Sequence, residues 1–146
     1  MIPDFDSKGN LPPGIHQVSW KEFKTRFGHN HYRKRLVDGM KLAFENLKKA
    51  GCKTVYVDGS FVTDRHRPKD YDGCWDPTGV NFDDLDPAFQ DFSRGTTAQK
   101  LKFRGELFTV TMNSPKGTML EFFQNDRDGD PKGIVVINLG DFNDKE

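Results

Sequence analysis

Two aspartates separated by one residue, Asp70 and Asp72, are the pair in this sequence whose type and spacing best suit chemistry. On a β-strand their side chains point to one face, and their Cα atoms lie about 6.6 Å apart. Carboxylates so placed converge on a divalent ion such as Mg²⁺, which takes phosphate oxygens among its other ligands. Asp76 has the same parity, but it lies about 13 Å from Asp72 along a strand, too far to share the ion.

A Gly-Ser pair, Gly59 and Ser60, ends the apolar run that precedes these aspartates. Glycine lets the backbone turn sharply and approach a ligand closely. A serine hydroxyl caps the turn, and the exposed N–H groups of such a turn cradle phosphate. The loop that follows carries cationic side chains, Arg65, Arg67 and Lys69. Because cations suit phosphate, the segment contains what is needed to hold a metal-bound triphosphate.

The order of these features resembles the signature of the polymerase-β-like nucleotidyltransferase superfamily, particularly its small stand-alone (minimal) members. That signature is an apolar strand, Gly-Ser, a loop of about this length, and Asp-x-Asp on the next strand. The matching residues are Gly59, Ser60, Arg67, Pro68, Asp70 and Asp72. With the preceding helix, the resemblance covers about residues 30–76. The stretches LPPGIH and GSFV…DYDGCWD also resemble an uncharacterised bacterial family of such domains.

The resemblance implies metal-assisted transfer of a nucleotidyl group from an NTP to a hydroxyl, with two Mg²⁺ ions. It assigns metal binding and catalysis to Asp70, Asp72 and a third acid on a later strand. Glu106 is the first candidate for that acid and Glu121 the second, although the family usually has aspartate there. Nucleotide binding falls to the turn and its loop, namely Gly59, Ser60, Arg65, Arg67 and Lys69. Gly73 stands where the family usually has an apolar residue.

Periodicity and turn signals predict an α/β (α+β) domain over residues 1–146, with residues 1–18 as an extended N-terminal arm. Helices are expected at 19–28, 30–50 and 96–103, strands at 53–58, 70–76, 105–112 and 133–139, and a helix or strand at 118–124. The long helix has an apolar face of Tyr32, Leu36, Met40, Ala43, Leu47 and Ala50. The resemblance implies a nucleotidyltransferase-like fold: a small mixed sheet flanked by helices, with strands 53–58 and 70–76 adjacent and antiparallel.

The composition places limits on partners and location. Lys+Arg and Asp+Glu are both 22, so the chain is not basic overall, although a local basic patch stays open. No apolar segment has the length of a membrane span, and the N-terminus lacks a signal pattern. We therefore expect a cytoplasmic protein without a membrane partner, in which Cys52 and Cys74 are buried, reduced thiols.

Two other charged segments have simpler interpretations. Asp126, Asp128 and Asp130 alternate, but Pro131 and Ile137 stand where a calcium-binding EF-hand loop needs glycine and glutamate, so we predict a polar turn. The run HNHYRKR, residues 29–35, is interpreted as a solvated helix face, with a grip on RNA or phosphate as the alternative.

The sequence thus predicts a cytoplasmic, magnesium-dependent nucleotidyltransferase that moves NMP from an NTP to a protein or RNA hydroxyl. A cognate partner protein is expected to supply acceptor binding, and the resemblance suggests a toxin–antitoxin or defence pair. One alternative is a non-catalytic nucleotide- or partner-binding module, antitoxin-like or regulatory, that lacks the third carboxylate. Another is an interaction protein in which Asp70 and Asp72 are only surface charge.

Overall fold

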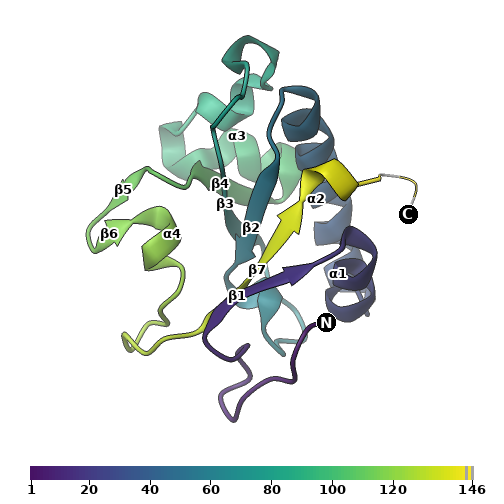
Figure 1. Ribbon diagram of the computed structural model, residues 1–146, viewed down its shortest axis with the longest axis vertical. Coiled ribbons are helices and arrows are strands. Elements are labelled where there is room, and N and C mark those ends of the chain that lie inside the picture. Colours follow the sequence, from purple (N-terminus) through teal and green to yellow (C-terminus); the bar gives the residue numbers. More distant parts are fainter. Residues whose placement is uncertain (144, 146) are drawn as a thin grey trace.

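A five-stranded mixed sheet in the order β1-β7-β2-β3-β4 organises the computed structural model, which describes residues 1–143 and 145 (Figure 1). Its strands are β1 Gly14–Val18, β2 Thr54–Asp58, β3 Tyr71–Trp75, β4 Gly105–Thr109 and β7 Gly133–Asn138. The pairs β1/β7 and β3/β4 are parallel, whereas β2 runs antiparallel to both β7 and β3. The antiparallel pairing expected between 53–58 and 70–76 is therefore confirmed.

Four helices and a small hairpin complete the chain. They are α1 Trp20–Phe27, α2 His31–Lys49, α3 Ser93–Phe103 and α4 Met119–Phe122, with the hairpin strands β5 Asn113–Ser114 and β6 Gly117–Thr118. Side-chain caps explain where the first two helices begin. Ser19 accepts a hydrogen bond from the Glu22 amide, and Asn30 accepts one from the Arg33 amide. The mixed α+β content predicted from the sequence is confirmed.

The two faces of the sheet differ in character. One face carries Val55, Val57 and Leu107 into a hydrophobic cluster with buried residues of α1 and α2. The ring of Phe108, on the opposite face, lies 6.4 Å from that of Phe123, which follows α4. Figure 1 accordingly shows α2 and α4 on opposite sides of the sheet. This second face carries the polar side chains described below.

Two sequence predictions need correction. Residues 1–18 are not only an arm, because Gly14–Val18 is an edge strand parallel to β7. Most of that strand is solvent-exposed, so it lacks the apolar alternation that marks a half-buried strand. On α2, the predicted apolar face is buried from Leu36 onward, but Tyr32 is 38% exposed. None of the described helices has the length and apolar character needed to cross a membrane.

Both cysteines are buried and unpaired, as predicted. Burial raises the pKa of the Cys52 thiol to about 11. It raises the pKa of the Cys74 thiol further, with the carboxylates of Asp58 and Asp72 contributing. Neither thiol is thereby made reactive, because the thiolate is the nucleophilic form.

Candidate functional site

Acidic side chains from three adjacent strands meet on the polar face of the sheet. The strand register places Asp72 of β3 opposite Asp58 of β2 and opposite Glu106 of β4. Side chains opposite one another in a sheet share a face, and so do residues two apart on one strand. Asp70, one residue before β3, therefore completes a group that we call the sheet carboxylates: Asp58, Asp70, Asp72 and Glu106.

The turn after β2 fits closely against this group. Gly59 has φ +84°, in the region that favours glycine, and a Cβ atom there would lie 2.6 Å from Asp72 Oδ2. Ser60 then begins a single 3₁₀ turn, Ser60–Val62, closed by a hydrogen bond of 2.6 Å that the Thr63 hydroxyl donates to the Ser60 carbonyl. Glycine thus allows the Asp72 carboxylate to lie against the turn.

Close packing also explains why glycine follows Asp72. A Cβ atom on Gly73 would lie 2.4 Å from the Tyr56 carbonyl oxygen and 2.8 Å from a methyl carbon of Leu107. This position is on β3, between β2 and β4, and it faces away from the carboxylates. The departure from the superfamily pattern at Gly73 is therefore a matter of packing and leaves the carboxylate face unchanged.

Like charges and burial raise the pKa values within the sheet carboxylates. Burial raises the pKa of Asp72 well above its usual range, and the charges of Asp70, Glu106 and Asp58 raise it further. Burial and the charge of Glu106 raise the pKa of Asp70, against the opposing effect of Lys100 and Lys69. Burial is thus the main cause of both raised pKa values, and the neighbouring carboxylates add to it.

Asp58 is the deepest of the sheet carboxylates, with only 2% of its surface exposed. Burial raises its pKa to about 6, although Lys132 opposes that effect. The Lys132 ammonium lies 3.1 Å from Asp58 Oδ1, and this lysine side chain is only 14% exposed. The chain thus places a largely buried cation of its own beside Asp58.

Glu106 is held in place by α3. The Thr96 hydroxyl donates a hydrogen bond of 2.6 Å to Glu106 Oε2, and the Lys100 ammonium lies 3.9 Å from the same oxygen. Near the start of α3, Arg94, Gly95 and Thr96 have left-handed backbone angles. Such angles are costly for residues other than glycine. This strained turn lies where Thr96 contacts the carboxylate.

The donor set of the sheet carboxylates fits a divalent cation. Hard carboxylate oxygens suit Mg²⁺, and like charges in a partly buried group need a cation or a proton between them. Taken three at a time, the oxygen atoms of the sheet carboxylates lie farther apart than ligand atoms that share one bound ion. Among the described residues, only Asp126, Asp128 and Asp130 bring three such ligand atoms within 4.8 Å of one another. Those three, the turn aspartates, already surround the Lys8 ammonium at 3.2, 3.8 and 2.8 Å respectively.

A cleft of about 980 Å³ opens beside the sheet carboxylates. Six of the residues that the sequence predicted for the site line it, namely Gly59, Ser60, Arg65, Lys69, Asp70 and Asp72. Further cationic residues that sequence reasoning missed line it too, namely Lys8, Lys116, Arg127 and Lys132. A cleft of this size is large enough for a small-molecule ligand, and its lining combines six cationic residues with five aspartates.

Three candidate residues do not line the cleft as expected, namely Arg67, Glu121 and Glu106, although Glu106 lies opposite Asp72 in the sheet. Arg67 does not line it, and its guanidinium lies 4.0 Å from the centre of the Tyr32 ring. The Glu121 carboxylate is used in the capping box at the start of α4, where it accepts hydrogen bonds from the Thr118 amide and hydroxyl. Of the two candidates for the third acid, Glu106 is therefore the one that lies beside Asp72.

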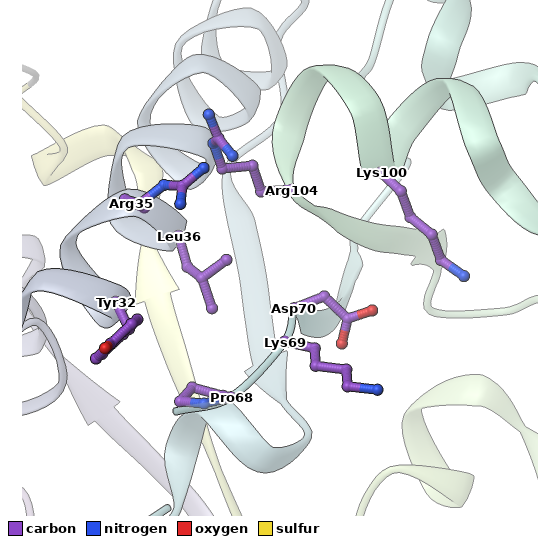
Figure 2. Close-up of a pocket in the computed structure, with 8 residues that line it drawn as sticks. All are labelled: Tyr32, Arg35, Leu36, Pro68, Lys69, Asp70, Lys100 and Arg104. Carbon is purple, nitrogen blue, oxygen red and sulfur yellow. The ribbon is translucent and has the colours of Figure 1, made fainter. Parts of the chain in front are cut away.

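A second, smaller hollow of about 360 Å³ meets the cleft at Lys69 and Asp70, which line both. Figure 2 shows that α2, α3 and the segment before β3 surround it. We call it the basic hollow, and it is lined by Tyr32, Arg35, Leu36, Pro68, Lys69, Asp70, Lys100 and Arg104. Asp70 thus lies where the two spaces join.

Arg33 fixes the loop that separates the Gly-Ser turn from Asp70. Its guanidinium is fully buried and donates to four backbone carbonyls, those of Phe27, Phe61, Thr63 and Arg65, at 2.6–3.1 Å. Burial lowers its pKa to about 10. The interpretation of residues 29–35 as a solvated face is therefore wrong for Arg33, because its partners come from a loop that sequence periodicity does not reveal.

Local patterns offered only weak signals for the missed residues. Asp58 directly precedes Gly59 and has the parity that places it on the face of Asp72. Lys132 directly precedes the last strand, but its pairing with Asp58 depends on how that strand is placed in the sheet. Lys8 lies in a turn far from the motif, so nothing in its neighbourhood connects it to the cleft.

The fold and the cleft define an α+β protein with acidic residues from adjacent strands at the edge of a cation-lined cleft. Within that class, the chain belongs to a family of unknown function, DUF6932, whose profile matches residues 3–138. No curated protein and no solved structure shows significant similarity to the chain.

Proposed function

We propose that this protein is a magnesium-dependent nucleotidyltransferase with a nucleotidyltransferase-like fold, which transfers NMP from an NTP to a protein or RNA hydroxyl. The observation that carries the proposal is the register of β3 with β4. It places Glu106 beside Asp72, two residues from Asp70, next to the Gly59–Ser60 turn. A glycine-serine turn and three acids on neighbouring strands are the elements that the resemblance to the polymerase-β-like superfamily requires.

The residues of the chain have distinct tasks in this reaction. The turn at Ser60 and the cations Arg65, Lys69 and Lys132 bind and orient the triphosphate in the cleft. The sheet carboxylates hold Mg²⁺, which when bound offsets charge on the triphosphate and the leaving pyrophosphate. The acceptor oxygen bonds to the α-phosphorus, the bond from that phosphorus to the β-phosphate oxygen breaks, and a carboxylate of the group accepts the hydroxyl proton.

Calorimetry with each of the four NTPs tests the binding step. We expect binding with Mg²⁺ and none without it, because the sheet carboxylates repel a triphosphate unless a cation lies between them. Transfer is tested separately, by incubating the protein with radioactive NTP and a bacterial lysate and following label into protein or RNA. Equal NTP affinity with and without Mg²⁺ would contradict the site as described.

A non-catalytic nucleotide- or partner-binding module is the second candidate. It is favoured by one observation: Asp70, Asp72 and Glu106 do not bring three ligand atoms within 4.8 Å of one another in the described structure. Magnesium-dependent NTP binding without labelling of any acceptor would select this module. In either case we propose that a partner protein in the cytoplasm, as in toxin–antitoxin or defence pairs, completes the function of so small a chain.

A further inference from the structure

The basic hollow has a strong excess of positive charge. Four of its lining residues, Arg35, Lys69, Lys100 and Arg104, are cationic, and Asp70 is the only acidic one. Within residues 1–143 and 145, the side chains of Arg35, Lys69 and Arg104 form no ion pair, and Lys100 pairs only with Glu106 at 3.9 Å. Three cations without an ion pair around one hollow, with Asp70 as the one acidic neighbour in its lining, are suited to a ligand with several negative charges.

The arrangement of these cations indicates more than one phosphate. Figure 2 shows that they come from separate elements, with Arg35 on α2, Lys69 before β3, Lys100 on α3 and Arg104 directly after α3. Arginine guanidinium groups match phosphate oxygens in a fork geometry. Cations placed around a hollow, instead of along one helix face, contact successive phosphates of a chain better than they contact a single anion.

An aromatic ring lies in the same hollow. Tyr32 is 38% exposed, and the Arg67 guanidinium lies over its ring at 4.0 Å. The His66 ring meets the Tyr32 ring edge-on at a centroid distance of 6.0 Å. Aromatic rings next to cations are the usual elements that bind single nucleic-acid strands, because the bases stack while the phosphates are neutralised.

We propose that the basic hollow binds the 3′ end of a single polynucleotide strand, whose terminal hydroxyl is presented to Asp70 as the acceptor. This inference rests on the proposed function and names the acceptor that the proposed function leaves open. The hollow and the cleft share Lys69 and Asp70, so acceptor and NTP approach the same carboxylate from different sides.

The reaction then extends the strand by one nucleotide. The 3′ oxygen of the strand forms a bond to the α-phosphorus of the NTP, and the bond from that phosphorus to the β-phosphate oxygen breaks. Pyrophosphate leaves with the electron pair of the broken bond, and the hydroxyl proton passes to a sheet carboxylate. No oxidant, reductant or further reactant is needed.

Fluorescence anisotropy of a 5′-labelled single-stranded RNA about 12 nucleotides long, a usual site size, tests binding without any NTP. The same sequence as DNA distinguishes the two kinds of strand. The double variant Arg35→Gln/Arg104→Gln removes two cations of the hollow. The matched control Lys34→Gln/Lys49→Gln removes two exposed cations of α2 that do not line the hollow.

We expect the wild type and the Lys34→Gln/Lys49→Gln control to bind the labelled strand with the same affinity. The Arg35→Gln/Arg104→Gln variant, called the hollow variant, should bind it more weakly. For a single strand, each lost phosphate contact reduces the slope of log affinity against log salt by about 0.7, so the hollow variant should lose about 1.4. An excess of NTP should not displace the strand, because NTP occupies the cleft. Binding of RNA alone or of DNA alone supports the inference and identifies the strand.

Other results separate this inference from the proposed function. Binding that depends on Arg35 and Arg104, in a protein that transfers no nucleotide, leaves the hollow as a polynucleotide site and removes the proposed enzyme. Transfer to protein alone, unchanged in the hollow variant, keeps the enzyme and overturns the inference. Equal strand binding by hollow variant and control, no strand binding at all, or capture of an acidic peptide in place of the strand also overturns it.

Discussion

The protein has two groups of acidic side chains, and they differ in what balances their charge. The turn aspartates are largely exposed and surround Lys8, and their hydrogen bonds lower the pKa of Asp126. The sheet carboxylates are partly or fully buried, and this burial, together with their mutual repulsion, raises the pKa of Asp72. Clustered acids are therefore not by themselves a sign of function. The informative difference is that the sheet carboxylates are at least partly buried and Asp58, Asp70 and Asp72 have raised pKa values, whereas the turn aspartates surround a lysine.

The geometry of the two groups explains this difference. The turn aspartates are alternate residues of one short loop that folds around a lysine from the N-terminal segment. The sheet carboxylates come from three strands, so their positions are fixed by a hydrogen-bonded ladder and cannot relax apart. Such rigidity would pre-organise the carboxylates for the cation that we propose.

The largest effect is expected on nucleotide transfer. Asp72→Asn removes a charge from the centre of the sheet carboxylates, and we expect transfer to fall by at least about 100-fold, as when a group that stabilises the transition state is lost. Asp128→Asn removes a charge from the turn aspartates at a residue that does not line the cleft, and it should leave transfer unchanged. Initial rates with radioactive NTP measure both. Similar losses in the two variants would mean that the comparison between the groups is wrong.

A smaller effect, on stability, is expected when the lysine that pairs with each acidic group is replaced. Lys132→Met leaves Asp58 buried without its cation, and we expect the free energy of unfolding at pH 8 to fall by about 2 kcal/mol. The Lys132→Met/Asp58→Asn double variant should recover much of that loss. Lys8→Met removes an exposed partner and should shift the urea midpoint only slightly. A Lys132→Met protein as stable as the wild type would contradict the buried ion pair.

The smallest effect is a dependence of stability on pH that has opposite signs in the two groups. The raised pKa values of Asp58 and Asp72 contribute stability below about pH 4, and this contribution is lost as pH rises through about 6 and above. Asp72→Asn should therefore raise the melting temperature at pH 8 without metal, by about 3 °C. The difference should vanish below about pH 3, where the wild-type carboxyl is protonated in both states.

The lowered pKa of Asp126 has the reverse consequence. Its contribution to stability is present above the pKa of the unfolded chain and is lost as pH falls. Asp126→Asn should accordingly lower the melting temperature slightly at pH 8. Calorimetric scans of both variants at several pH values, with and without Mg²⁺, measure the two signs. If the melting temperature shifted in the same direction in Asp72→Asn and Asp126→Asn, the opposite pKa shifts of the two groups would be refuted.

The sequence by itself determined the features that depend on neighbours along the chain. Ser19, Gly28 and Asn30 mark helix ends because a cap acts within a few residues, and each is found at such an end. The run from residue 53 to the Gly-Ser turn and the Asp-x-Asp spacing located β2, β3 and their carboxylate face, because side chains alternate along a strand. Short-range rules were sufficient for these elements.

Only the tertiary structure decided which distant side chains share the site. Glu106 lies beside Asp72 because β4 pairs parallel to β3 in one register, and a shift of one residue would turn Glu106 to the other face. Lys132 reaches Asp58 and Arg33 reaches the loop carbonyls through contacts between segments far apart in the sequence. The same charged residue is solvated or buried according to these contacts, and no local pattern encodes them.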